Sequence, residues 1–422
     1  MNSLEFNKKY ELDSETASKI VPSQRPKSTN SIAGKPKVLI VEVLKRFFTN
    51  PVVVISTIVF LTIIITAVIV TIFPTYKPGT SIASDAKSNN YWDQGLSDVG
   101  GLPPVFAPHI SVTNSSIIDQ VNTFNDPNYA YSKYLKEYLD FRSVASDRII
   151  IDYYKYYYAR QLNVAIVKAF NEGYVIDDSF VNYLKTQVDQ FTLKTYFGTT
   201  FSDRDIWSTV WAGALESIKI AFFVATVEVI IGVTIGAYLG FHAGKWIDTV
   251  LMRMIDIFQA PPSIIWLLMF ISLSKDGPND WILIAGLLFT GWTWPIHSTR
   301  LFIITVKDEE YILASKSIGA SKNRQIFFHA LPAILGKIAM NYVRRIPGVI
   351  LSIASLSFLG FYNSPDSYNL GKFLSDNIGK ETENPWIVII PATTLLLLSL
   401  SLQFIAIGLH DALDPKVIKI KR

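Results

Sequence analysis

An apolar run at residues 52–73 is the strongest constraint on how this chain can fold. It contains no charged side chain, and Pro51 and Pro74 bound it. A helix of this length crosses a hydrocarbon core of roughly 30 Å. Lys45 and Arg46 precede the run, and basic residues beside a transmembrane helix are retained on the cytoplasmic side. We therefore expect a transmembrane helix at residues 51–74, after a polar cytoplasmic tail at residues 1–50.

Five further apolar runs predict five more crossings, which makes the chain an all-α integral membrane protein. They lie at residues 217–241, 249–273, 281–303, 338–361 and 386–409. The third crossing contains Pro261 and Pro262, which should kink it. Six crossings return the C-terminus to the cytoplasm, where we expect a basic tail at residues 416–422. The basic residues between crossings agree with this orientation.

Composition supports a membrane protein and excludes several functions. Half of the residues are hydrophobic, only 18% are charged, and a net charge of +4 gives no support for a nucleic-acid partner. The chain has no cysteine, which excludes disulfides, thiol catalysis and cysteine-ligated metals. No two of its five histidines have the spacing of a helical metal pair, so we expect no metal site.

Residues 75–208 form a polar insertion between the first two crossings, and the predicted topology places it outside the cell membrane. Tyrosines recur at helical spacing between Tyr129 and Tyr174, which predicts two or more amphipathic helices. These side chains could form a ligand surface, but packing in the insertion's own core is the favoured interpretation. The remaining chain, residues 209–415, is predicted to be a five-helix core that contains a cytoplasmic segment at residues 304–337.

Several residues in the apolar runs are candidates for special roles. Glycines spaced by four predict a close helix-packing face, and they are Gly232, Gly236, Gly240 and Gly244. Ionisable side chains in a membrane are costly, so Glu228, Arg253 and Asp256 are candidates for a transport pathway or gate. For Arg253 and Asp256 an ion pair three residues apart is the favoured alternative. No partner for Glu228 is visible in the sequence.

Residues 310–332, EYILASKSIGASKNRQIFFHALP, predict a compact polar helical pair between apolar runs. Acidic residues open the first helix, Gly319 can stop it in a left-handed conformation, and Ser321 can cap the second. The second helix is predicted to end at Leu331 and Pro332. We name residues 310–332 the EAA-like segment, because they resemble the EAA loop of ABC importer permeases. The matching positions are Glu310, Tyr311, Ala314, Gly319, Ala320, Ser321, Arg324, His329, Leu331 and Pro332.

Other stretches resemble the C-type permease of oligopeptide and dipeptide importers. They are Gly198-Thr199-Thr200 with Arg204-Asp205, the region from Gly240 to Pro261, LSFLG at residues 356–360 after Ser355, and HDALDP at residues 410–415. The resemblance covers roughly residues 40–75 and 195–418. Phe328 departs from it, since a basic residue is usual there.

This resemblance implies a six-helix type I importer permease in the cell membrane, which passes oligopeptides inward. Its EAA loop would dock on an ATPase subunit. The implied partners are a second homologous permease, two ABC ATPase subunits and an extracytoplasmic peptide-binding protein. The chain has no P-loop motif, so ATP and Mg²⁺ are expected on the partner subunits and the chain itself is not expected to be an enzyme.

Alternative functions remain open at this point. The same machine could carry another cargo, such as a dipeptide, nickel or glutathione. A membrane receptor or anchor with an outer binding domain is a less favoured alternative, because it has no use for an EAA-like segment. An intramembrane hydrolase is disfavoured by the absence of a nucleophile or HExxH motif. The insertion lies where a binding protein would dock, which suggests that it enlarges that interface.

Overall fold

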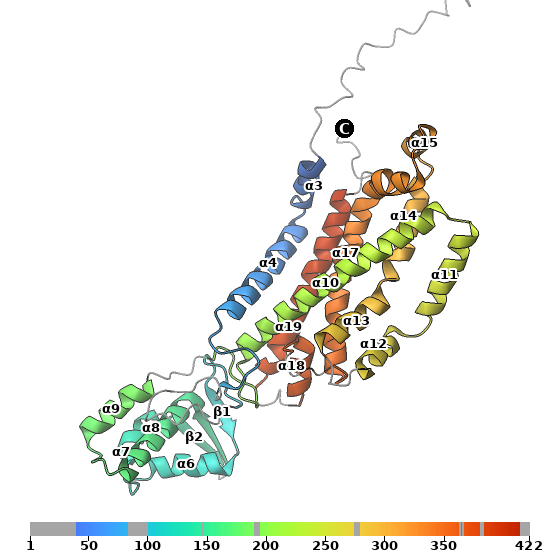
Figure 1. The fold of residues 1–422 in the computed structure, drawn as a ribbon. Helices are drawn as coiled ribbons and strands as arrows, with labels where there is room; N and C mark the ends of the chain where they lie inside the picture. The colour runs from blue at the N-terminus through green and yellow to red at the C-terminus, as the bar shows by residue number, and fades with distance from the viewer. Residues whose placement is uncertain are drawn as a thin grey trace, which may run out of the picture. The chain divides into compact units, whose positions relative to one another are not determined.

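The computed structural model describes residues 39–82, 100–145, 147–189, 195–273, 279–362, 364, 367–379 and 384–413 (Figure 1). The chain divides into two units, residues 1–46 and residues 47–422. The first unit contributes most of helix α3 (Leu39–Phe47), in which Glu42 and Arg46 form an ion pair at 3.2 Å. Most of the predicted N-terminal tail, the whole C-terminal tail and the end of the HDALDP motif lie outside the described residues.

Helix α4 (Pro51–Ile72) corresponds to the apolar run at residues 52–73. Its N-cap is Asn50, whose side-chain oxygen accepts a hydrogen bond from the backbone N–H of Val52 at 3.0 Å. Proline at the first helical position loses no intrahelical hydrogen bond. The helix therefore begins where the sequence predicts it.

The apolar part after the insertion is helical throughout its described length, apart from short connections. Its elements are α10 (Ile206–Phe241), α11 (Trp246–Gln259), α12 (Ser263–Ser272), α13 (Asp280–Gly291), α14 (Trp294–Val306), α15 (Glu310–Ser317), α16 (Lys322–Arg324), the π-helix η3 (Gln325–Ala330), α17 (Leu331–Phe358), α18 (Leu370–Asn377) and α19 (Trp386–Leu413). Helix α18 lies in a stretch that the sequence predicts only as a polar loop.

Within the described residues, four helices are long and apolar enough to cross a membrane, and they are Pro51–Ile72, Ile206–Phe241, Lys322–Phe358 and Trp386–Leu413. The pair α11 and α12 bends by 70° and adds a fifth crossing if it is one span. This bend confirms the kink predicted at Pro261 and Pro262. The described residues thus do not confirm six crossings, because residues 281–303 are divided between α13 and α14. Helix α14 restarts after Thr293 with Pro295 in its first turn.

Helix α10 is the central element of the helical core. It packs against α4, α13, α14, α17 and α19 (Figure 1). Buried side chains from α4, α10, α13, α17 and α19 form one apolar cluster, which includes Ile63, Val224, Leu283, Ile350 and Leu398. Because α10 contacts so many partners, its small and charged residues decide how closely the neighbouring helices approach.

The insertion contains a β-sheet, so the all-α prediction is wrong for this part of the chain. Its elements are β1 (His109–Val112), α6 (Ser115–Asn125), α7 (Ser132–Leu135), the 3₁₀ helix η2 (Lys136–Tyr138), β2 (Phe141–Ala145), β3 (Arg148–Asp152), α8 (Tyr153–Asn171) and α9 (Asp178–Asp189). The strands are antiparallel in the order β1-β3-β2. Helical periodicity was a poor guide here, because three consecutive isoleucines at residues 149–151 favour an extended strand.

The tyrosines of the insertion mostly pack in its own core. Tyr134 and Tyr156 are buried with Val121, Ile151 and Leu162. Other tyrosines at positions 129, 131, 138, 153 and 158 pack against this cluster. The favoured interpretation of the tyrosine pattern therefore agrees with the structure.

Specific hydrogen bonds join the base of the insertion to the helical core. The side-chain amide of Asn384, just before α19, donates to the carbonyl oxygens of Leu102 and Phe197, both at 3.2 Å. Within the insertion, the hydroxyl of Tyr154 donates to the carbonyl oxygen of Pro103 at 2.7 Å. The two hydrogen bonds of Asn384 thus connect the insertion to a segment of the helical core that is far away in the sequence.

Candidate functional site

Gly319 separates the two helices of the EAA-like segment, α15 and α16. Helix α15 ends at Ser317, and Gly319 has φ +86°. The N–H of Ala320 then donates to the carbonyl oxygen of Ser315 at 3.0 Å, which closes the helix end. Ser321 is the N-cap of α16, and its hydroxyl accepts a hydrogen bond from the N–H of Arg324 at 3.4 Å. The predicted stop and cap both occur.

The second helix of the segment continues where the sequence predicts that it ends. After α16 the backbone widens into the π-helix η3 and then runs directly into α17, with Pro332 in the first turn of α17. A proline in a regular helix clashes with the carbonyl group four residues earlier. The wider π turn lies at that position, so the chain passes the proline without breaking. The predicted end at Leu331 and Pro332 is therefore wrong.

The EAA-like segment has one face packed on the bundle and one face open. Ile312, Ile326 and Ala330 are buried in a cluster with Ala237 of α10 and Ile303 of α14. Of the matched positions, Glu310, Tyr311, Ala314, Gly319, Ser321, Arg324 and Pro332 are exposed, whereas Ala320, His329 and Leu331 are half-buried. The open face thus consists largely of the residues that the resemblance singles out.

Exposed apolar side chains accompany these matched residues. Ile318 is 87% exposed and Phe328 is 75% exposed, and Tyr311 is also open to its surroundings. Large exposed hydrophobic side chains grouped on one surface are typical of an interaction site. Phe328, the departure from the family pattern, is therefore placed on the open face.

Three of the four spaced glycines face helix α14 at close range. A Cβ atom at Gly232 would lie 2.8 Å from the Cβ of Pro295, and one at Gly236 would lie 2.6 Å from the carbonyl oxygen of Ile296. At Gly240 it would lie 2.7 Å from the Cβ of Ile303. Only glycine lets α10 and α14 approach this closely, as in small-residue packing of membrane helices.

Gly244 is not part of that face. It follows the end of α10, has φ +83°, and has no atom within 4 Å of the position that a Cβ would occupy. Its role is in the turn to α11, where its N–H donates to the carboxylate of Asp248 at 3.1 Å. The spacing of four therefore continues past the end of α10, into a turn where glycine has a different role.

Glu228 has a partner that the sequence did not reveal. Its side chain is fully buried and accepts hydrogen bonds from Arg345 of α17 at 2.5 and 2.8 Å. The two residues are 117 positions apart, so only the packing of α10 on α17 brings them together. A bidentate guanidinium–carboxylate pair satisfies a charge that would otherwise be costly in the membrane.

Arg253 and Asp256 lie on α11 as a loose ion pair. Their closest side-chain atoms are 3.7 Å apart, and the Arg253 side chain is 80% exposed. The carboxylate of Asp256 also lies 3.8 Å from Nε2 of His297 on α14. The structure therefore places these two candidates near each other, and each has a different charged neighbour from that of Glu228.

A second strong ion pair, Asp248 with Arg300, was not singled out from the sequence. Arg300 of α14 donates to the Asp248 carboxylate at 2.6 and 2.7 Å, and Asp248 is buried. This pair fixes the start of α11 against α14. In the sequence, Asp248 directly precedes one apolar run and Arg300 lies near the end of another. These positions indicate that each charge needs a partner, but they do not indicate which residue the partner is.

Comparison with known proteins identifies the family. The family described as "Binding-protein-dependent transport system inner membrane component" matches residues 232–419. The oligopeptide transport system permease protein OppC of Bacillus subtilis is 32% identical over 224 residues, which cover 53% of this chain and 72% of that protein. The chain belongs to this family of ABC transporter permeases.

Two further relatives of this permease support the same assignment. The dipeptide transport system permease protein DppC of Alkalihalophilus pseudofirmus is 33% identical over 224 residues, with 53% of this chain and 72% of that protein covered. The OppC protein of Mycoplasma pneumoniae is 32% identical over 234 residues, and 61% of its length is covered. Both the apolar helices and these relatives indicate a multi-pass membrane protein.

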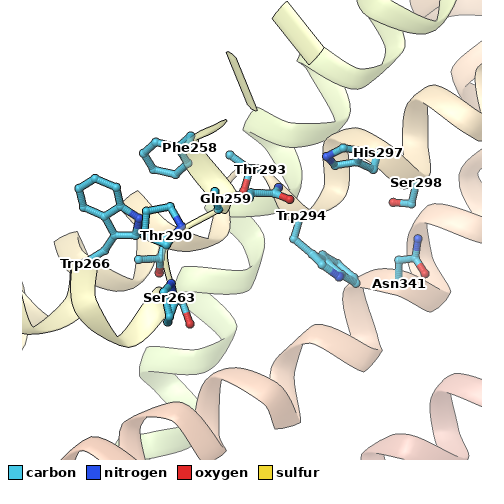
Figure 2. Close-up of a pocket in the computed structure, with 13 residues that line it drawn as sticks. Phe258, Gln259, Ser263, Trp266, Thr290, Thr293, Trp294, His297, Ser298 and Asn341 are labelled. Carbon is cyan, nitrogen blue, oxygen red and sulfur yellow. The ribbon is translucent and has the colours of Figure 1, made fainter. Parts of the chain in front are cut away.

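The permease has a cavity beside the break between α11 and α12, and both polar and apolar side chains line it. Its volume is about 580 Å³, and its lining includes Gln259, Thr293, His297, Ser298 and Asn341. Figure 2 shows His297, Ser298 and Asn341 gathered on one side of this cavity, with Phe258 and Trp266 on the other. The rings of Phe258 and Trp266 are stacked with centroids 5.4 Å apart. Sequence reasoning missed this cavity, because its polar residues come from separate helices.

Proposed function

We propose that this chain is the permease subunit of an ATP-driven importer of oligopeptides, and that it forms half of the translocation pathway. The names of its relatives support a peptide cargo, since they are oligopeptide and dipeptide transport permeases. The second half of the pathway would come from a homologous permease subunit. An extracytoplasmic binding protein would deliver the peptide, and two ABC ATPase subunits would carry ATP and Mg²⁺.

The EAA-like segment is the observation that carries this proposal. Its inner face is fixed to α10 and α14, while the exposed side chains of Tyr311, Ile318 and Phe328 form a firm projection. A projection held in this way can transmit a movement of an ATPase subunit to the helices behind it. ATP binding would then favour one of two bundle conformations through differential contacts with this surface.

The proposed orientation places both termini and the EAA-like segment in the cytoplasm and the insertion outside. It follows from the basic residues near the helix ends, such as Lys45, Arg46 and Lys316. The insertion would then lie on the side where the binding protein docks. We propose that the insertion forms part of the surface on which the binding protein docks. The exposed side chains of Tyr174 and Val175, between α8 and α9, are the candidate contacts. Replacing both by serine should weaken binding-protein affinity, and unchanged affinity would refute this share.

Coupling is tested by placing charges on the open face of the EAA-like segment. Ile318→Asp and Glu310→Lys should each lower ATP-dependent peptide uptake by the assembled complex roughly tenfold or more. The reason is that a few interface residues usually carry most of the binding energy, here that between the EAA-like segment and the ATPase subunit. Lys316→Gln is the matched control, because Lys316 is exposed on α15 but lies outside the matched positions. Unchanged uptake and ATPase activity in the two charge variants would refute the coupling role.

A further inference from the structure

Strand β1 forms one edge of the insertion's sheet, where β3 is its paired neighbour. The N–H of Tyr153, which follows β3, donates to the carbonyl oxygen of Pro108, which precedes β1, at 3.0 Å. Successive backbone groups of an antiparallel strand point alternately toward and away from the partner strand. Counted from this hydrogen bond along the register, the N–H and C=O groups of His109 and Ser111 point away from β3.

These outward backbone groups leave β1 as an open edge. Within the part of the chain that the structure describes, no hydrogen bond satisfies the outward N–H and C=O groups of His109 and Ser111. The sequence of β1, HISV, has no proline or lysine that would discourage a further strand from pairing. The other edge strand, β2, is interrupted by a bulge between Ser143 and Ala145, a feature that protects sheet edges. Of the two edges, β1 is therefore the regular one.

A cavity of about 680 Å³ runs along this open edge. It is lined by every residue from His109 to Asn114, and by Gly100, Gly101, Ile117 and Tyr153. Side chains of a strand alternate between its two faces, so a cavity over one face would meet only every second residue. Contact with a continuous run of residues indicates instead that the cavity follows the edge. The four residues of β1 offer about 13 Å of edge, which suits about four residues of an extended chain.

We propose that this cavity binds the cargo peptide in an extended conformation, as an additional strand on β1. That the occupant is the cargo rests on the proposed peptide-import function. An extended peptide presents N–H and C=O groups on one side at every second residue, which is the spacing of His109 and Ser111. Pairing of this kind takes its affinity from the main chain, so one site can accept peptides of many sequences. The proposed orientation places the insertion outside, on the side from which the cargo arrives.

The test measures the affinity of fluorescently labelled pentaalanine for the complete transporter in lipid nanodiscs, without the binding protein, by fluorescence anisotropy. Ser111→Pro removes the outward N–H of residue 111, and an edge strand tolerates proline where its nitrogen faces away from the sheet. The affinity should fall roughly 10-fold or more, since a hydrogen bond is lost and a carbonyl group of the peptide is left without its partner. Ser111→Ala keeps the N–H and should retain most of the affinity.

Ser143→Pro is the matched control on the other edge of the sheet. The N–H of Asp152 donates to the carbonyl oxygen of Asp140, just before β2, at 2.8 Å, so the register directs the N–H of Ser143 away from β3 as well. This variant should leave pentaalanine binding unchanged. Pentaalanine methylated at every amide nitrogen should bind wild type roughly 10-fold more weakly, because it has lost its backbone donors. That comparison does not depend on the folding of any variant.

Equal affinity of wild type and Ser111→Pro, or equal weakening by Ser111→Pro and Ser143→Pro, would overturn the inference. Unchanged pentaalanine binding with weaker docking of the binding protein on Ser111→Pro would overturn it too, and would assign the edge to a strand of the binding protein. A wild-type complex that imports pentaalanine but does not bind it at this edge would overturn the inference and leave the proposed function intact. Binding that depends on Ser111 in a complex that imports no peptide would support the site and contradict the proposed function.

Discussion

Glu228 of α10 and Arg345 of α17 form the most deeply buried charge pair in the described part of the helical core, with two hydrogen bonds at 2.5 and 2.8 Å. Gly291, at the end of α13, makes room for it. A Cβ atom at Gly291 would lie 1.6 Å from an oxygen of the Glu228 carboxylate. Three helices therefore meet at this pair, and its removal should affect stability in a characteristic way.

Breaking the pair from one side should cost more than removing it altogether. Arg345→Met leaves the Glu228 carboxylate buried without a partner, and we expect a loss of about 3–5 kcal/mol in the free energy of unfolding. The double variant Glu228→Leu with Arg345→Met removes both charges and should recover most of that loss. Unfolding of the detergent-solubilised protein by heat or denaturant measures the difference. A double variant no more stable than Arg345→Met would contradict this account.

Gly319 should be required because its backbone adopts a left-handed conformation, and not because a side chain at this position would clash with neighbouring atoms. Its φ is +86°, and no atom lies within 4 Å of the position that a Cβ would occupy. Gly319→Val places a β-branched residue in the left-handed region at a cost of about 1–2 kcal/mol, which should distort the turn between α15 and α16. Gly319→Asn is the control, since asparagine tolerates this region. We expect the valine variant to import less peptide for each ATP hydrolysed, and the asparagine variant to remain close to wild type. Equal ratios for both variants would refute the requirement.

Local patterns in the sequence predicted local structure well. The start of α4, the bend at Pro261 and Pro262, and the stop at Gly319 each depend on a few adjacent residues, and the sequence contains them all. The continuation of the helix through Pro332 was missed. It depends on a π turn, in which hydrogen bonds join residues five apart instead of four. No residue type in the segment specifies a π turn over a regular helical turn.

Contacts between residues far apart in the sequence could not be predicted from the sequence. Glu228 and Arg345 are 117 residues apart, and either could have paired with several other charges. The tyrosine spacing predicts a helix where residues 148–152 form strand β3, because a sheet becomes recognisable only once its partners β1 and β2 are in place. The cavity beside Asn341 likewise needs α11, α14 and α17 in place before it exists.

The close contact between α10 and α14 should make Gly236 intolerant of even a methyl group. A Cβ there would lie 2.6 Å from the carbonyl oxygen of Ile296, and backbone atoms cannot move aside as a flexible side chain can. Gly236→Ala should therefore destabilise the protein by about 1–3 kcal/mol through overpacking. Gly348→Ala is the matched control in another apolar helix, because its nearest atom is 3.8 Å away, and it should cause no loss. Thermal unfolding in detergent compares the two, and equal effects would refute the role of the glycine face.

Asp205, the N-cap residue before α10, should make stability depend on pH. Burial raises the pKa of its carboxyl from 3.8 to about 6, although its oxygen accepts a hydrogen bond from the N–H of Ser208 at 2.8 Å. The folded state therefore holds this proton more tightly than the unfolded state does. The resulting stabilisation is present below about pH 4 and is lost as the pH rises through about 6. Asp205→Asn keeps a capping oxygen but removes the charge. The variant should gain unfolding temperature relative to wild type at pH 7, and this gain should shrink toward pH 4. A difference that stays constant across this range, or grows as the pH falls, would contradict the assignment.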